Sequence, residues 1–184
     1  MMSDEAAVAM IDALNALAVD YMIVGSVSSA FYGSPTAGLG VDFVARLTQS
    51  QVSALAERLS PRLTLEHPEE SGTALRYLFR SADAGAYVEL YRLSDDPYDE
   101  ERFARRVRVK LFGRDTFLPT AEDVVVTKLL WYGEGPRAKH FEDARNVVLV
   151  QRDALDWDYV QRLCDRHGTR ELLDKIRRSI PQVD

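Results

Sequence analysis

The stretch from Tyr21 to Val44 constrains the fold of this chain more than any other. A short apolar run, YMIV, is followed at once by Gly25-Ser26, then by small residues, breakers and a second apolar run, Val41–Val44. This order predicts a strand, a tight turn, a short helix, a loop and a second strand. Asp42 lies inside the second run, and a carboxylate in an apolar strand is costly unless something pairs with it. We therefore expect a metal ion or a cation beside Asp42.

The overall composition limits the partners that suit this chain. It carries 29 acidic and 23 basic side chains, a net charge of −6, which does not favour non-specific binding to nucleic acid or to an anionic membrane. No apolar run approaches the length of a membrane span, and the N-terminus is unlike a signal peptide. The one cysteine excludes an internal disulfide and a cysteine zinc site. We therefore expect a cytoplasmic protein of one domain, or of one domain with a small appendage.

The pattern up to residue 118 predicts both helices and strands. Ser3 caps a first helix, and a capping box at Thr48–Gln51 begins another that ends near Leu59. From residue 62 to residue 118 the pattern predicts strands alone. Two hairpins are expected: residues 75–79 pair with residues 87–93, and residues 106–111 pair with residues 115–118. In the second strand of the first hairpin, alternation puts Glu89 on one face with two tyrosines and leaves Val88 and Leu90 on the other.

After residue 118 the character of the chain changes to helix. Thr120 is a helix cap with acids in the first turn, and four helices are expected over 121–132, 138–150, 156–164 and 169–179. The expected fold class is therefore α/β (α+β), with a core over residues 1–118 and a small C-terminal helical part over 119–184 packed on that core.

A basic face on the second hairpin is the best candidate for nucleic-acid contact, although it is not a strong signal. Alternation places Arg106, Arg108 and Lys110 on one side of their strand. A charged outer face that protects an edge hairpin from aggregation is the commoner explanation, and the acids between residues 95 and 101 could neutralise it.

Four segments together resemble the polymerase-beta-type nucleotidyltransferase superfamily. They are the Gly25-Ser26 turn, the acidic strand Val41–Val44, the later strand Tyr87–Leu90, and the helix 122–130 followed by the helix that contains 141–145. More narrowly, the chain resembles the small bacterial branch that includes toxin-like nucleotidyltransferases of abortive-infection systems. The resemblance runs from about Tyr21 to Gly168 and implies a nucleotidyltransferase-fold mixed sheet with helices.

The resemblance also implies a catalytic site for Mg²⁺-dependent transfer of a nucleotide to RNA, protein or a small acceptor. Asp42 and Glu89 match the positions of the family's metal ligands. Gly25 and Ser26 match the turn that meets the nucleoside triphosphate at a helix N-terminus. Lys128 matches the helical lysine that neutralises the phosphates, and Asp143, which lies on the following helix, would orient Lys128.

The sequence departs from the family pattern at the metal site. The family's two strand acids are separated by one residue, and here those positions are Gly40 and Asp42, so the first acid is missing. Upstream, Thr36 and Gly38 replace an arginine and a hydroxyl residue that many relatives carry. The remaining acids could hold one Mg²⁺, whereas a two-metal site is not expected. We expect a nucleotide-binding protein with weak or lost transfer, and whether it is an enzyme stays open. The alternative is a pseudoenzyme that binds a protein partner, for example as a regulator in a toxin–antitoxin system.

Each candidate residue also has a simpler structural explanation. Gly25-Ser26 could be only a tight connection and helix cap, and Asp42 could form an ion pair with an arginine or lysine. Glu89 could lie on a solvated sheet face, and Lys128 could extend its ammonium group to solvent from an apolar helix. Asp143 could be a surface acid, but pairing with Lys128 is preferred.

Overall fold

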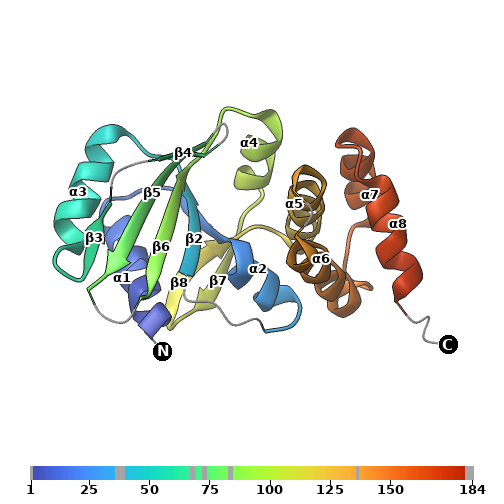
Figure 1. Ribbon diagram of the computed structural model, residues 1–184, viewed down its shortest axis with the longest axis horizontal. Helices are drawn as coiled ribbons and strands as arrows, with labels where there is room; N and C mark the ends of the chain where they lie inside the picture. The colour runs from blue at the N-terminus through green and yellow to red at the C-terminus, as the bar shows by residue number, and fades with distance from the viewer. Residues whose placement is uncertain are drawn as a thin grey trace. The chain divides into compact units, whose positions relative to one another are not determined.

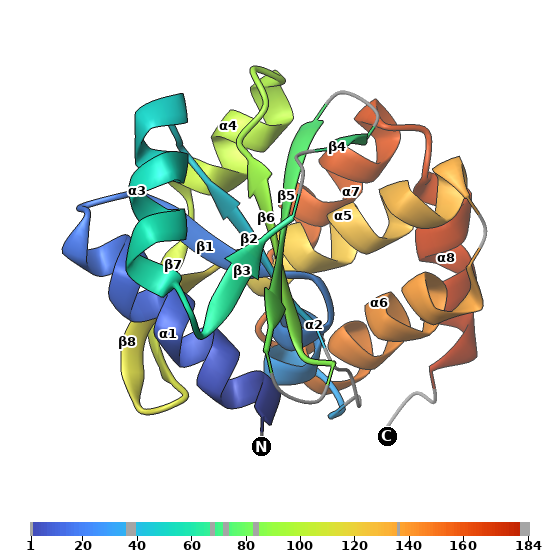
Figure 2. The same ribbon diagram turned by 60° about the vertical axis from the view of Figure 1, so that its left-hand side comes forward.

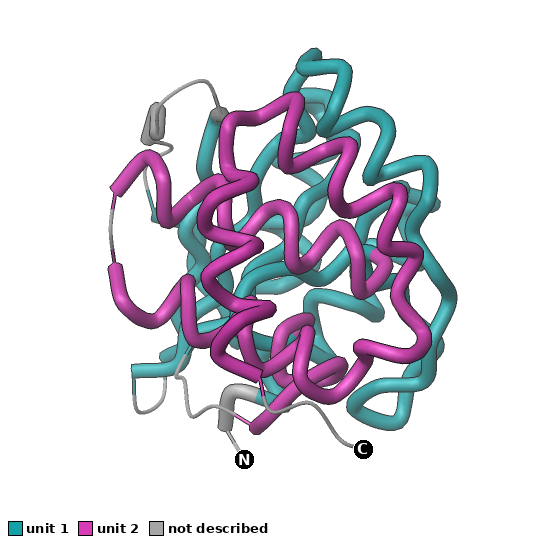
Figure 3. Tube along the Cα trace, turned by 90° about the vertical axis from the view of Figure 1, so that its right-hand side faces the viewer, with its two compact units in different colours: residues 1–27, 37–119 teal, residues 28–36, 120–184 magenta. Residues whose placement is uncertain are grey.

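The computed structural model describes residues 2–35, 40–66, 69–71, 74–82, 85–135 and 137–180. Thr36 and Gly38, which the sequence comparison singled out, lie outside the described residues. The chain divides into two compact units, coloured separately in Figure 3. Unit 1 comprises residues 1–27 and 37–119, and unit 2 comprises residues 28–36 and 120–184. Each unit is thus made of two separate stretches of the chain.

Unit 1 is built on a mixed sheet, as expected for the α/β fold class (Figure 1). Its strands lie in the order β1 (Tyr21–Val24), β2 (Gly40–Ala45), β6 (Tyr87–Arg92), β5 (Ala74–Ser81) and β3 (Leu63–Leu65), with β4 (Glu69–Ser71) also paired to β5. Strands β2 and β6 run parallel, and every other pair in this sheet is antiparallel. The expected hairpin of β5 and β6 is therefore confirmed.

One face of this sheet forms the main core of unit 1. Helices α1 (Met2–Ala16) and α3 (Gln49–Leu59) pack together over it (Figures 1 and 2). The strand residues on this face are fully buried aromatic and aliphatic side chains, namely Tyr21, Ile23, Phe43, Tyr77, Phe79, Val88 and Leu90. The capping box of Thr48 and Gln51 is present at the start of α3, as predicted. Helix α1 begins at Met2, so the expectation that Ser3 precedes the helix as its cap is wrong by two residues.

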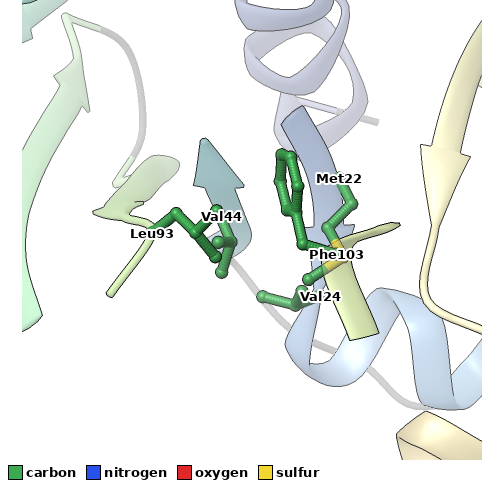
Figure 4. Close-up of a cluster of buried hydrophobic side chains, with 5 residues drawn as sticks. All are labelled: Met22, Val24, Val44, Leu93 and Phe103. Carbon is green, nitrogen blue, oxygen red and sulfur yellow. The ribbon is translucent and has the colours of Figure 1, made fainter. Parts of the chain in front are cut away.

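Helix α4 (Pro97–Ala104) covers one end of the opposite face and was not predicted. The Asp96 carboxylate accepts hydrogen bonds from the backbone N–H groups of residues 98 and 99, and Pro97 takes the first helical position. Phe103 inserts into a buried cluster with Met22, Val24, Val44 and Leu93 (Figure 4). The expectation of strands alone between residues 62 and 118 is wrong here, because acids dominate the segment and hide its short apolar stripe.

The second hairpin, β7 (Val107–Leu111) with β8 (Arg114–Leu118), forms where it was expected. Its basic side chains are largely paired. Arg106 donates to Asp20 at 2.7 Å and lies over the ring of Phe103, while Arg108 donates to Asp115 at 2.9 Å. Asp20 and Asp115 therefore neutralise two of the arginines of this face. These pairings weaken the case for a nucleic-acid surface.

Unit 2 is helical. It contains α5 (Ala121–Glu134), α6 (Ala138–Gln151), α7 (Trp157–Arg166) and α8 (Arg170–Ser179), which match the four predicted helices, and most of α2 (Gly25–Tyr32). A Cβ atom at Gly33 would lie 3.0 Å from the backbone of α6, so the end of α2 packs directly on that helix. Gln151 Nε2 donates to the carbonyl of Tyr32 at 2.9 Å. Within the described part of the chain, no helix has both the length and the apolar character needed to cross a membrane.

Candidate nucleotide and metal site

Asp42 and Glu89 lie directly opposite each other on the parallel strands β2 and β6. Residues in register on neighbouring strands project from the same face, so the two carboxylates share the face opposite the main core. The same register places Gly40 beside Tyr87 and Val44 beside Tyr91. The expectation that these two acids would lie on neighbouring strands and on one face is confirmed.

Gly25 brings the start of α2 against Asp42. Its φ angle is +67°, a conformation that favours glycine, and a Cβ atom there would lie only 1.9 Å from Asp42 Oδ2. Glycine is therefore required at position 25 for two reasons, the positive φ angle and the close approach of the Asp42 carboxylate. A negative charge near a helix N-terminus is favourable, so Asp42 has a structural contribution whatever it binds.

The ring of Tyr87 lies over Gly40. A Cβ atom at Gly40 would fall 2.2 and 2.4 Å from two ring carbons and 2.8 Å from the hydroxyl oxygen of Tyr87. The space that a side chain at position 40 would enter is therefore filled by the tyrosine. Sequence reasoning missed this contact, because the pairing of Gly40 with Tyr87 depends on the register of two strands that are far apart in the chain.

Glu89 is held by two side chains. The guanidinium of Arg76, on β5, forms an ion pair with Glu89 Oε1, and the Tyr91 hydroxyl donates to Oε2 at 3.4 Å. The side chains of Arg76 and Glu89 are 24% and 19% exposed, so Glu89 is a paired, half-buried acid rather than one on a solvated face. Arg76 was not recognised from the sequence. The signal was the alternation of β5, whose buried Tyr77 and Phe79 leave Arg76 on the other face.

The two tyrosines beside Glu89 stay protonated at neutral pH. Burial, followed by the charges of Glu89 and Asp42, raises the pKa of Tyr91 to about 12. The same causes in the same order raise the pKa of Tyr87. The two phenols are therefore available as hydrogen-bond donors and are not general bases.

In unit 2, Lys128 and Asp143 form a buried pair between α5 and α6. Lys128 Nζ donates to Asp143 Oδ2 at 2.8 Å, and the two side chains are 4% and 3% exposed. The preferred pairing is confirmed, and the alternative of a lysine reaching solvent is wrong. Next to the pair, burial and the charge of Lys128 lower the pKa of His140, whose ring meets Trp131 edge-on. The role of Lys128 toward a phosphate stays a prediction.

Solved structures resemble this chain over most of its length. No family model and no curated protein matches the sequence. The solution structure of the antibiotic-resistance factor ANT(2'')-Ia matches with a TM-score of 0.65 at 13% identity, covering 96% of both chains. An antigenic nucleotidyltransferase-like protein from Paracoccidioides brasiliensis matches with a TM-score of 0.57 at 17% identity, covering 99% of this chain and 94% of its own. This chain has a nucleotidyltransferase fold.

A third similar structure is more distant. The lincosamide antibiotic adenylyltransferase LnuA, bound to lincomycin, has a TM-score of 0.53 at 12% identity and covers 76% of this chain and 92% of its own. At these identities the likeness concerns the fold alone. Membership of the abortive-infection branch stays a prediction from the sequence.

The described residues do not fit the two-metal centre that the nucleotidyltransferase fold would suggest. Among them, no three His, Cys, Asp or Glu side chains lie close enough to hold a metal ion together. Gly40 contributes no ligand and lies beneath Tyr87, while Glu89 is engaged by Arg76. A single Mg²⁺ on Asp42 and Glu89 stays a prediction, and the ion would have to share Glu89 with Arg76.

Proposed function

We propose that this protein belongs to the nucleotidyltransferase superfamily and binds a nucleoside triphosphate, and that its Mg²⁺-dependent nucleotidyl transfer is weak or lost. The main support for weak or lost transfer is the tyrosine ring over Gly40, because this ring fills the space where the resemblance places the first catalytic acid. The fold and the close packing of Gly25 on Asp42 support membership of the superfamily and binding of a triphosphate.

Each candidate residue has a defined role in this proposal. The backbone N–H groups at Gly25 and Ser26 and the Ser26 hydroxyl, at the start of α2, bind the phosphates. Lys128 supplies a positive charge to the phosphate tail, and Asp143 fixes the lysine side chain through their 2.8 Å contact. The acceptor stays open among RNA, protein and a small molecule such as lincomycin, the antibiotic bound in the LnuA structure.

Calorimetric titration with ATP, GTP, CTP and UTP, with and without Mg²⁺, tests nucleotide binding. We expect measurable affinity for at least one triphosphate, and a weaker affinity in Ser26→Ala. The matched control is Ser53→Ala, an exposed serine on α3, which should bind as the unsubstituted protein does. Lys128→Ala should weaken triphosphate binding more than monophosphate binding, whereas equal losses would mean that the lysine is only structural.

Two outcomes would contradict the proposal. Robust Mg²⁺-dependent incorporation of a labelled nucleotide into an acceptor would show that the missing acid is supplied elsewhere. No affinity for any of the four triphosphates, together with a stable protein complex recovered from cells, would favour the pseudoenzyme regulator instead.

A further inference from the structure

We infer that Arg76 is a built-in cation that takes the place of a divalent metal ion beside Asp42 and Glu89 and excludes the metal from this site. The inference deepens the proposed function and rests on it only in treating these two acids as the metal-binding positions. It also gives Arg76, which the family resemblance does not include, a defined part in setting what the site binds.

The contacts of Glu89 carry the inference. Its two carboxylate oxygens are engaged by different side chains, Oε1 by the Arg76 guanidinium and Oε2 by the Tyr91 hydroxyl. A metal ion that bridged Asp42 and Glu89 would need an oxygen of Glu89 as a ligand. The arginine therefore competes directly with a metal for the same carboxylate.

The position of Arg76 on the sheet makes the contact persistent. Arg76 lies opposite Tyr91 in the register of β5 and β6, two residues along the strand from Leu78, which is opposite Glu89. Such diagonal neighbours on one face are within reach of a long side chain. The guanidinium is charged at every accessible pH, and its charge would repel a divalent cation held next to it.

The competition between Arg76 and a metal ion should be measurable as a change in metal affinity. A hydrogen bond to a charged group contributes enough that removing it should change the metal dissociation constant by about tenfold or more. Removing the arginine also takes a positive charge away from two neighbouring carboxylates, and a hard divalent ion relieves their repulsion. A variant without Arg76 should therefore gain both metal affinity and metal-dependent stability.

Arg80 offers a matched control on the same strand and the same face. It lies opposite Tyr87, is 54% exposed, and pairs with Glu66 rather than with Glu89. Replacing either arginine by glutamine removes one positive charge from β5, but only the Arg76 variant removes the charge that contacts Glu89.

The test is a titration of the whole protein with Mn²⁺ alone, followed by electron paramagnetic resonance of the free ion and by thermal unfolding. Arg76→Gln should bind Mn²⁺ at least about tenfold more tightly than the unsubstituted protein and melt at a higher temperature as Mn²⁺ is added. Arg80→Gln should bind as the unsubstituted protein does. Adding Asp42→Asn to Arg76→Gln should abolish the gain.

Two results would overturn the inference. One is equal Mn²⁺ affinity in the unsubstituted protein and in Arg76→Gln, and the other is a gain that survives Asp42→Asn. Should Arg76→Gln fail to fold without metal, Arg76→Lys tests the charge itself, and tight Mn²⁺ binding by that variant would overturn the inference as well. Because no nucleotide is present, these results are independent of whether the protein binds a triphosphate.

Discussion

Because the ring of Tyr87 lies over Gly40, we expect Gly40→Ala to destabilise the protein when the ring is present and to stabilise it when the ring is removed. Gly40 does not have a positive φ, so alanine is acceptable to the backbone and only the ring opposes it. With the new Cβ atom 2.2 Å from a ring carbon, the ring must swing aside or the strand must shift. Overpacking of this kind costs about 1–3 kcal/mol, which corresponds to a fall in Tm of about 2–4 °C per kcal/mol for a chain of this size.

Removing the ring should reverse the effect. In the Tyr87→Ala background, Gly40→Ala meets no ring and should stabilise the protein by about 0.4–1 kcal/mol, because it reduces the conformational freedom of the unfolded chain. A double-mutant cycle measured by urea unfolding should therefore give a coupling free energy of about 1.4–4 kcal/mol between the two positions, the difference between that loss and that gain.

Gly133→Ala serves as the control for this cycle. A Cβ atom at Gly133, within α5, meets nothing within 4 Å, so that substitution should be neutral or stabilising and independent of position 87. A Gly40→Ala effect that is the same with and without Tyr87 would refute the reasoning. The same contact means that Gly40→Asp alone is hindered, and that any attempt to restore the acid should be made in the Tyr87→Ala background.

Two other predictions concern the buried charges and the tyrosines. Lys128→Met should lower the free energy of unfolding by about 3–5 kcal/mol, because it leaves Asp143 as an uncompensated buried charge; adding Asp143→Leu should recover most of that loss in urea unfolding, and no recovery would mean that the pair is not the cause. The pKa of Tyr91 is raised in the folded state from 10.0 to about 12, so its contribution to stability is complete below pH 10 and is lost as the pH rises to about 12. Tyr91→Phe should flatten this alkaline fall in unfolding free energy, and an unchanged fall would show that other groups cause it.

Local patterns in the sequence were enough to predict most of the elements. The capping residues Thr48 and Thr120, the apolar run of β2 and the alternation of β6 are signals carried by a few neighbouring residues, and the structure confirms them. Helix α4 escaped prediction because its buried residues, Tyr98, Arg102 and Phe103, are outnumbered by acids and include a charged residue.

The partners within the candidate site could not be predicted in the same way. Alternation placed Glu89 on the correct face, but it does not say which side chain of a neighbouring strand will meet it. The ion pair with Arg76 and the ring over Gly40 both depend on strand register, which is fixed by pairing across the whole sheet. Family resemblance pointed to the acids and not to the residues that occupy the space around them.

The division of unit 2 into two stretches of chain restricts how its gene can be rearranged. Residues 28–36 are encoded far from residues 120–184, yet Gly33 packs on the backbone of α6 and Gln151 bonds to Tyr32. A cassette cut at residue 119 would separate these partners and leave each fragment with an exposed packing surface. Recombination at a single junction therefore cannot exchange this helical part between genes without also replacing the segment that follows the Gly25-Ser26 turn.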